Sequence, residues 1–222
     1  MKNFRFHPSS LRLSHWNFIM MPPGHVAATW GVAAVAQQHN PKLARLDYRL
    51  LAVCALLPDI IDKPLAILVF TDAPTSQLIA HSLLFNLALL IAALLFWRVA
   101  VPYVLAFNAH LLADRMWHHT ETFWWPIFGW RTFWEYKPMN TAGEMFNVYV
   151  DIIMRYPQVW AIELIALTIF VWFGLRFRLY RWPRMKVFLW TGQIWTNEKI
   201  PGLDQTKPRN KKTPLQSSPQ PD

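Results

Sequence analysis

Apolar residues in this chain are gathered into long blocks that charged residues interrupt only at their ends. Asp, Glu, Lys and Arg are absent from Leu78 to Trp97 and again from Val99 to Ala113. The first block is about as long as the roughly 20 apolar residues that cross a bilayer as a helix. A third block, Pro157 to Gly174, contains Glu163 as its only charge, and Arg176 follows soon after it. We interpret this third block as the last membrane span.

Two shorter apolar segments come before these blocks. The first runs from His25 to Gln38, after a turn predicted at residues 22–24, and Asn40 and Pro41 end it. The second runs from Leu46 to Leu57 and is predicted to end before Pro58, because proline disrupts a helix interior. Both segments are short for membrane spans, so a buried or tilted hairpin and a full crossing are both open.

This pattern predicts two helical hairpins. The first joins the two short segments, and the second joins the block from Leu78 to a return segment ending at Asp114, with a turn at Arg98 to Pro102. The predicted fold class is all-α, a polytopic membrane helical bundle built from two helical hairpins plus a C-terminal transmembrane helix. Tryptophans are frequent in residues 115–156, and we interpret them as head-group anchors rather than as a platform for an aromatic substrate.

Composition divides the chain into four parts. Residues 1–22 form an N-terminal basic segment, residues 23–175 the membrane-embedded domain and residues 176–198 a basic juxtamembrane segment. Residues 199–222 are polar and rich in Pro and Lys, which is typical of a disordered tail.

The formal net charge of +9 indicates which partners to expect. The cations lie mainly beside apolar segments, where they meet anionic lipid head groups, so the expected partner is membrane lipid and not nucleic acid. The basic C-terminal end is predicted to be cytoplasmic in a bacterial inner membrane, although Lys2, Arg5 and Arg12 argue for the opposite orientation. With Cys54 as the only cysteine, an intramolecular disulfide and a cysteine-based zinc site are excluded.

Histidines and aspartates recur where the predicted helices begin or end. A single histidine beside an apolar run is more often a core residue than a ligand. Here, however, antiparallel hairpins bring the ends of four helices together, and ionisable groups at such depths are functional candidates. His110 and Asp114 are also spaced i, i+4 and therefore share one helical face. The residues concerned are His25, Asp59, Asp62, His81, His110 and Asp114.

The order of motifs GHVAA, LLPDIID, AHS and HLLAD, followed by WWPIFGW, resembles the membrane-bound metal-dependent hydrolases that include the LexA-binding, inner-membrane-associated hydrolases. The motifs extend over residues 23–126. A more distant similarity is to zinc-dependent phospholipase C. The resemblance implies one or two divalent ions, zinc favoured, and a phosphoester or lipid-linked substrate. The implied metal ligands are His25, Asp59, His81, His110 and Asp114.

The resemblance also implies a metal-assisted attack of water on the substrate. Asp59 or Asp62 would accept the proton, and His118 is a candidate general acid or extra ligand, with His119 less certain. Members of the family usually carry Arg-Gly-x-Thr before the His-Ser pair, whereas this chain has residues 77–80 without a cation. Lys63, directly after Asp62, is a candidate substitute, although we favour its interpretation as a lysine that extends toward the membrane edge. Two alternatives stay open, a metal-binding membrane transporter and a membrane-anchored scaffold without catalysis.

Overall fold

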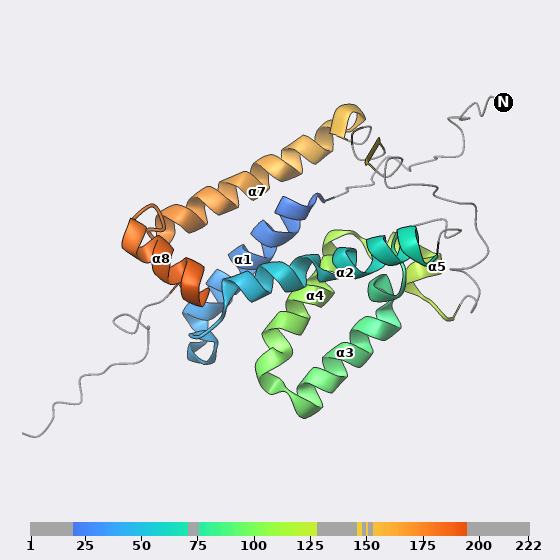
Figure 1. The fold of residues 1–222 in the computed structure, drawn as a ribbon, viewed down its shortest axis with the longest axis horizontal. Coiled ribbons are helices and arrows are strands. Elements are labelled where there is room, and N and C mark those ends of the chain that lie inside the picture. Colours follow the sequence, from blue (N-terminus) through green and yellow to red (C-terminus); the bar gives the residue numbers. More distant parts are fainter. Residues whose placement is uncertain (1–19, 71–75, 128–145, 148–149, 151–152, 195–222) are drawn as a thin grey trace, which may run out of the picture.

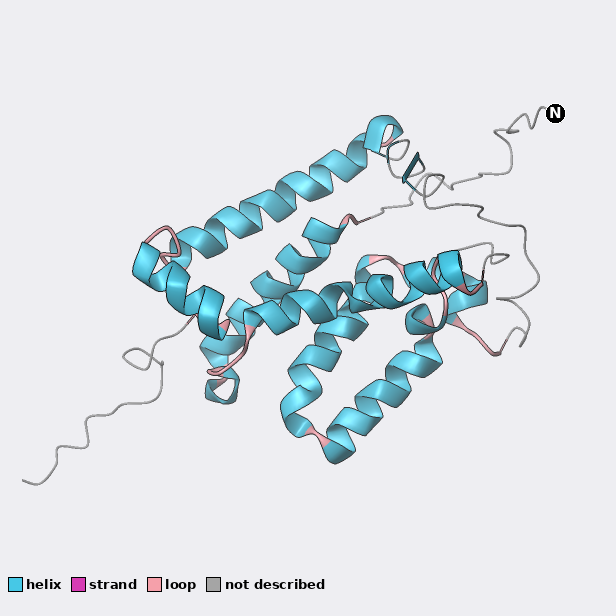
Figure 2. Cartoon of the chain, viewed as in Figure 1, coloured by secondary structure: helices cyan, strands magenta, loops and turns pink. Residues whose placement is uncertain are grey.

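The computed structural model describes residues 20–70, 76–127, 146–147, 150 and 153–194 (Figure 1). Every element in this part of the chain is helical, as predicted (Figure 2). The longer helices are α1 (Pro22–His39), α2 (Tyr48–Leu68), α3 (Leu83–Phe96), α4 (Val101–Ala113), α7 (Pro157–Arg176) and α8 (Trp182–Thr191). Short helical turns are η1 (Pro41–Leu43), η2 (Ile79–His81), η3 (Arg98–Ala100), η4 (Met116–His118) and α5 (Thr120–Phe123).

The helices pack as pairs around α1 and α2. Figure 1 shows α1 between α7 and α2, with α4 against α2 and the α3–α4 hairpin beside them, and these pairs all make direct contacts. The predicted turn near Arg98 is present as η3, and the predicted break at Asn40 and Pro41 is present as η1. The main core lies where α1, α2, α7 and α8 meet, around Trp30, Tyr48, Phe173 and Phe188.

Helix α2 is longer than the sequence predicted, and this is a correction. It continues through Pro58 and Pro64 to Leu68, so Asp59 and Asp62 lie inside a helix and not at its end. Tertiary packing provides the reason, because Pro58 and Ala66 are buried in the interior and their burial offsets the missing backbone bonds. The prolines at positions 22 and 23 likewise belong to the first turn of α1, where a missing N–H costs nothing.

Helix α7 is the one helix in the described ranges that is long and apolar enough to cross a membrane. Only 17% of its apolar stretch is buried inside the protein, so most of its apolar surface is not covered by the described residues. The polytopic arrangement of the remaining helices stays a prediction. Of the tryptophans predicted to be head-group anchors, Trp117 is exposed and Trp124 is half-buried. Trp130 and Trp134 lie outside the described residues, as do the N-terminal 19 residues and the predicted tail.

Candidate metal centre

The structure brings five of the predicted residues together in two groups that share His110. His25, His110 and Asp114 form one group, and Asp59, His81 and His110 form the other. Within each group the candidate ligand atoms all lie within 4.8 Å of one another. Four elements contribute, because His25 comes from α1, Asp59 from α2, His81 from η2, and His110 with Asp114 from α4 and its C-cap.

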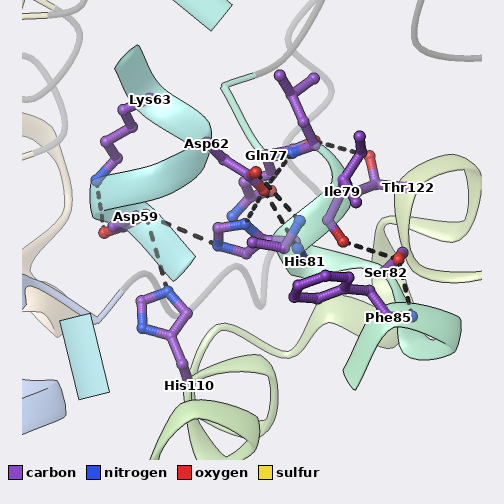
Figure 3. A network of polar contacts seen from close by, with 12 residues as sticks. Asp59, Asp62, Lys63, Gln77, Ile79, His81, Ser82, Phe85, His110 and Thr122 are labelled. Atoms are coloured by element: carbon purple, nitrogen blue, oxygen red, sulfur yellow. Dashed lines mark hydrogen bonds and ion pairs between the residues drawn. The ribbon is translucent and has the colours of Figure 1, made fainter. Parts of the chain in front are cut away.

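Asp62 fixes the orientation of His81. Nδ1 of His81 lies 2.7 Å from Oδ2 of Asp62, and the backbone N–H groups of Leu78, Ala80 and His81 donate to the same carboxylate (Figure 3). Both side chains are fully buried. With its Nδ1 proton held by Asp62, His81 presents Nε2 as an acceptor, which is the arrangement that carboxylates impose on metal-ligating histidines. Asp62 itself lies in neither ligand group.

A backbone carbonyl fixes His110 in the same sense. Nδ1 of His110 donates to the carbonyl oxygen of Ala55 over 2.7 Å. Its Nε2 points toward Asp59 and Asp114, at 3.8 Å and 3.3 Å from their nearest oxygens. The Nε2 atoms of His81 and His110 are buried and find no hydrogen-bond partner among the described residues.

Asp59 is held from one side by Lys63, one turn later in α2. Nζ of Lys63 lies 2.6 Å from Oδ2 of Asp59 (Figure 3). The other oxygen, Oδ1, faces Nε2 of His81 at 3.7 Å and Nε2 of His110 at 3.8 Å. Lys63 therefore places a positive charge at the edge of the site, on the far side of the carboxylate from the two imidazoles.

His25 and Asp114 complete the second group. Nε2 of His25 lies 3.1 Å from Oδ1 of Asp114 and 3.2 Å from the carbonyl oxygen of Met20, and its ring stacks on His110 with 4.0 Å between the centroids. Asp114 is the C-cap of α4, where the negative end of the helix dipole disfavours a carboxylate. A nearby cation would offset that cost.

The donor set fits a divalent cation. The buried Nε2 atoms of His81 and His110 find no hydrogen-bond partner in the described residues and lie 3.3 to 3.8 Å from carboxylate oxygens of Asp59 and Asp114. Neutral imidazole nitrogens and carboxylate oxygens are all acceptors, and they repel one another unless positive charge lies between them. Ligands about 2.1 Å from a tetrahedral zinc lie about 3.4 Å apart, similar to the 3.3 to 3.8 Å between these atoms. Nitrogen and oxygen donors of this kind suit zinc, manganese, iron or nickel.

Two supporting residues were not among the predicted site residues. The amide of Asn86 donates to the carbonyl oxygens of Ala80 and Ser82, on either side of His81. Glu163 of α7 accepts a hydrogen bond from the backbone N–H of Met21, at the start of the helix that carries His25. Asn86 is the only polar residue between Leu83 and Phe96, and Glu163 is the only charged residue between Pro157 and Gly174. That isolation is the sequence signal that marks them.

His118 and His119 lie beyond α4 at and after the end of η4, where both are exposed. Neither belongs to the two ligand groups in the described part of the chain. The catalytic and ligand roles of all these residues stay predictions, whereas the proximity of five of them is a property of the fold.

We compared the chain with known proteins and protein families. No curated protein and no solved structure matches the chain. One family model, described as YdjM inner membrane protein, matches residues 20–184, which include α1 to α7 and every candidate ligand. The chain therefore belongs to the YdjM inner membrane protein family.

Proposed function

We propose that this protein is a membrane-bound, metal-dependent hydrolase acting on a phosphoester or lipid-linked substrate. The observation that carries the proposal is the pair of imidazoles, His81 and His110, whose Nδ1 atoms are engaged and whose Nε2 atoms converge with Asp59 and Asp114. Buried ionisable groups in a membrane protein are retained chiefly for function. Zinc is the favoured ion because of the ligand types.

A bound divalent ion would polarise the scissile bond and acidify a water molecule. Of the two aspartates predicted to accept a proton, Asp59 is the better placed, because its Oδ1 faces the site and its side chain is 14% exposed. Asp62 is fully buried and already accepts four hydrogen bonds. We therefore assign proton transfer to Asp59 and the orientation of His81 to Asp62.

Lys63 supports an anionic substrate. The chain lacks the cation that its relatives usually place before the His-Ser pair, and Lys63 brings an ammonium group to the edge of the site instead. A phosphoester is anionic and gains from this charge when it approaches the metal ligands. The inner-membrane family and the apolar α7 favour an amphiphilic substrate, and we extend the membrane location to the α1–α2 and α3–α4 hairpins.

The first experiment is elemental analysis of detergent-purified protein. Wild type is compared with a His110→Ala, Asp114→Ala double variant and with His39→Ala, which removes an exposed histidine at the end of α1. We expect near-stoichiometric metal in wild type and His39→Ala and little in the double variant. Equal, negligible metal in all three would overturn the proposal.

Activity is then measured on metal-loaded protein with a chromogenic phosphodiester and with phospholipid in mixed micelles. Turnover lost on chelation and restored by added metal would support hydrolysis. Full metal loading without turnover on either substrate would leave a metal-binding membrane protein, as a transporter or scaffold would be.

A further inference from the structure

An open apolar groove lies where α7 turns into α8. Its volume is about 440 Å³, within the range of ligand pockets, and its walls are apolar and aromatic. Residues of α1, of the end of α7 and of α8 line it, and the Trp30 ring of α1 contacts the Phe188 ring of α8 with 5.5 Å between the centroids. The lining includes Trp30, Phe170, Gly174, Leu179, Met185 and Phe188.

Gly174 of α7 is one of the lining residues, and the space beside it is open. A Cβ atom added there would meet no atom of the described residues within 4 Å. Because no described atom lies within 4 Å, a larger side chain would fit at this position. Alanine is also favoured over glycine in a helix interior, so the glycine is not retained for helix stability. The space at Gly174 is therefore accessible from outside the protein and is not required by close helix packing.

The segment from Leu175 to Phe188, which contributes lining residues to the groove, also carries cations, which lie beside the lining residues in the sequence and are not themselves part of the lining. Residues 175–188 contain five cations and no Asp or Glu. The cations are Arg176, Arg178, Arg181, Arg184 and Lys186. Two of these cations make cation–π contacts. The Nζ atom of Lys186 lies 5.3 Å from the centroid of the Trp182 ring, and the guanidinium carbon of Arg181 lies 5.9 Å from the centroid of the Tyr180 ring. This combination of aromatic rings and cations is typical of a membrane interface.

Helix α8 is fixed in place, which gives the groove a firm wall. The Arg49 guanidinium donates to the carbonyl oxygens of Leu189 and Trp190, both at 2.8 Å, and the N–H of Tyr48 donates to the carbonyl oxygen of Gly192 at 2.8 Å. These bonds attach the C-terminal end of α8 to the start of α2. The α8 residues that line the groove, Met185 and Phe188, therefore belong to a helix that is attached to the start of α2.

We propose that this groove binds the acyl chain of an anionic phospholipid, whose phosphate group lies among the cations of residues 176–186. The groove begins at the basic end of α7, the helix that is able to cross a membrane, so apolar walls and cations meet where acyl chains meet head groups. An uncharged lipid would make no use of the five cations, and a soluble anion would leave the apolar groove unfilled. The inference is independent of the metal centre.

The test titrates the full-length protein, in a neutral detergent, with phosphatidylglycerol or phosphatidylcholine of identical acyl chains, and with glycerol phosphate as the free anion. The readouts are Tm and the number of bound lipids in native mass spectrometry. We expect phosphatidylglycerol to raise Tm and to remain bound, and the other two probes to have little effect. An equal effect of both phospholipids, or an effect of glycerol phosphate as large as that of phosphatidylglycerol, would overturn the proposal.

Two variants at one position separate the groove from the surface charge. Gly174→Leu fills the groove and should weaken phosphatidylglycerol binding by about tenfold or more, whereas Gly174→Ala adds one methyl group and should keep it within about twofold. Undiminished lipid binding by Gly174→Leu would overturn the assignment of the acyl chain to the groove.

A third variant removes two cations and leaves the lining residues of the groove unchanged. Arg181→Gln combined with Arg184→Gln should retain the unliganded Tm and lose the preference for phosphatidylglycerol over phosphatidylcholine. An unchanged preference in this variant would overturn the assignment of the head group. Because the charge is removed at partly and fully exposed positions, misfolding is not expected to obscure the result.

Discussion

Glu163 of α7 accepts a hydrogen bond from the backbone N–H of Met21, with 3.0 Å between Oε1 and the nitrogen. Met21 is the N-cap of α1, and its own side chain makes no capping bond. A carboxylate at this place also complements the positive end of the α1 dipole. The charge inside the apolar α7 therefore attaches the membrane helix to the turn that carries His25.

Replacing Glu163 should loosen the start of α1. We expect Glu163→Ala to lower the free energy of unfolding by about 1 to 3 kcal/mol, because the N–H of Met21 loses its acceptor, and Glu163→Gln to lower it less, because the amide oxygen still accepts. Thr168→Val, an exposed change on the same helix, is the control and should stay within about 0.5 kcal/mol. Thermal unfolding in detergent measures all three, and equal stability of Glu163→Ala and the control would contradict the capping role.

Removing the charge of Asp62 should weaken metal binding without removing a ligand. In Asp62→Asn the Nδ1–H group of His81 no longer faces a charged carboxylate oxygen, and the amide group that replaces it can also donate, so Nε2 loses its fixed role as acceptor. We expect metal affinity to fall by about 10- to 100-fold, as is typical when a partner of a ligating histidine is changed. Competition with a chelator measures the affinity. Asp47→Asn, remote from the site, should leave it unchanged.

Gly192 should tolerate no side chain. Its φ is +68°, and a Cβ atom there would collide with the carboxylate of Asp47. Gly192→Ala should therefore destabilise the attachment of α8 by at least about 1 to 2 kcal/mol. Gly174→Ala, in an open position of α7, should instead stabilise its helix by about 0.5 to 1 kcal/mol. Opposite shifts in Tm are expected. An unchanged or raised Tm for Gly192→Ala would contradict the packing described for Gly192, and a lowered Tm for Gly174→Ala would contradict the open position of Gly174.

The attachment of α8 should weaken in acid. Hydrogen bonding from Arg49, opposed by partial burial, holds the pKa of Asp47 below its usual value of 3.8. A group with a lowered folded-state pKa stabilises the fold fully above the unfolded value and loses this contribution as pH falls through the folded value. Protection of the α8 amides from hydrogen exchange, taken relative to the intrinsic exchange rate at each pH, should therefore fall below about pH 4. In Asp47→Asn that acid-dependent step should be absent, and its persistence would assign it to another group.

The basic end of the protein should be cytoplasmic. The cations after α7 outnumber those at the opposite end of the span, and cytoplasmic flanks of membrane helices are enriched in Lys and Arg. In a Cys54→Ser background, Lys186→Cys should react with a membrane-impermeant maleimide only after spheroplasts are permeabilised. Labelling of intact spheroplasts at this position would reverse the orientation.

The sequence by itself determined the helical class, the position of the apolar α7, the turn at η3 and most of the candidate ligands. Long apolar blocks cross a membrane or fill a core as helices, and a proline or a charge at a block's end shows where the helix stops. The spacing of His110 and Asp114 already placed both on one face, because it follows from helix geometry alone.

Only the tertiary structure decided which partner each histidine has. The predicted hairpins place both Asp59 and Asp62 near His81. In the structure Asp62 binds the Nδ1 atom of His81 and Asp59 faces its Nε2 atom, and these different roles depend on how η2 packs against α2. The continuation of α2 through Pro58 could not be predicted from the sequence either, because proline locally favours the end of a helix unless burial elsewhere offsets the lost hydrogen bond. Long-range packing, which adjacent residues do not encode, made both choices.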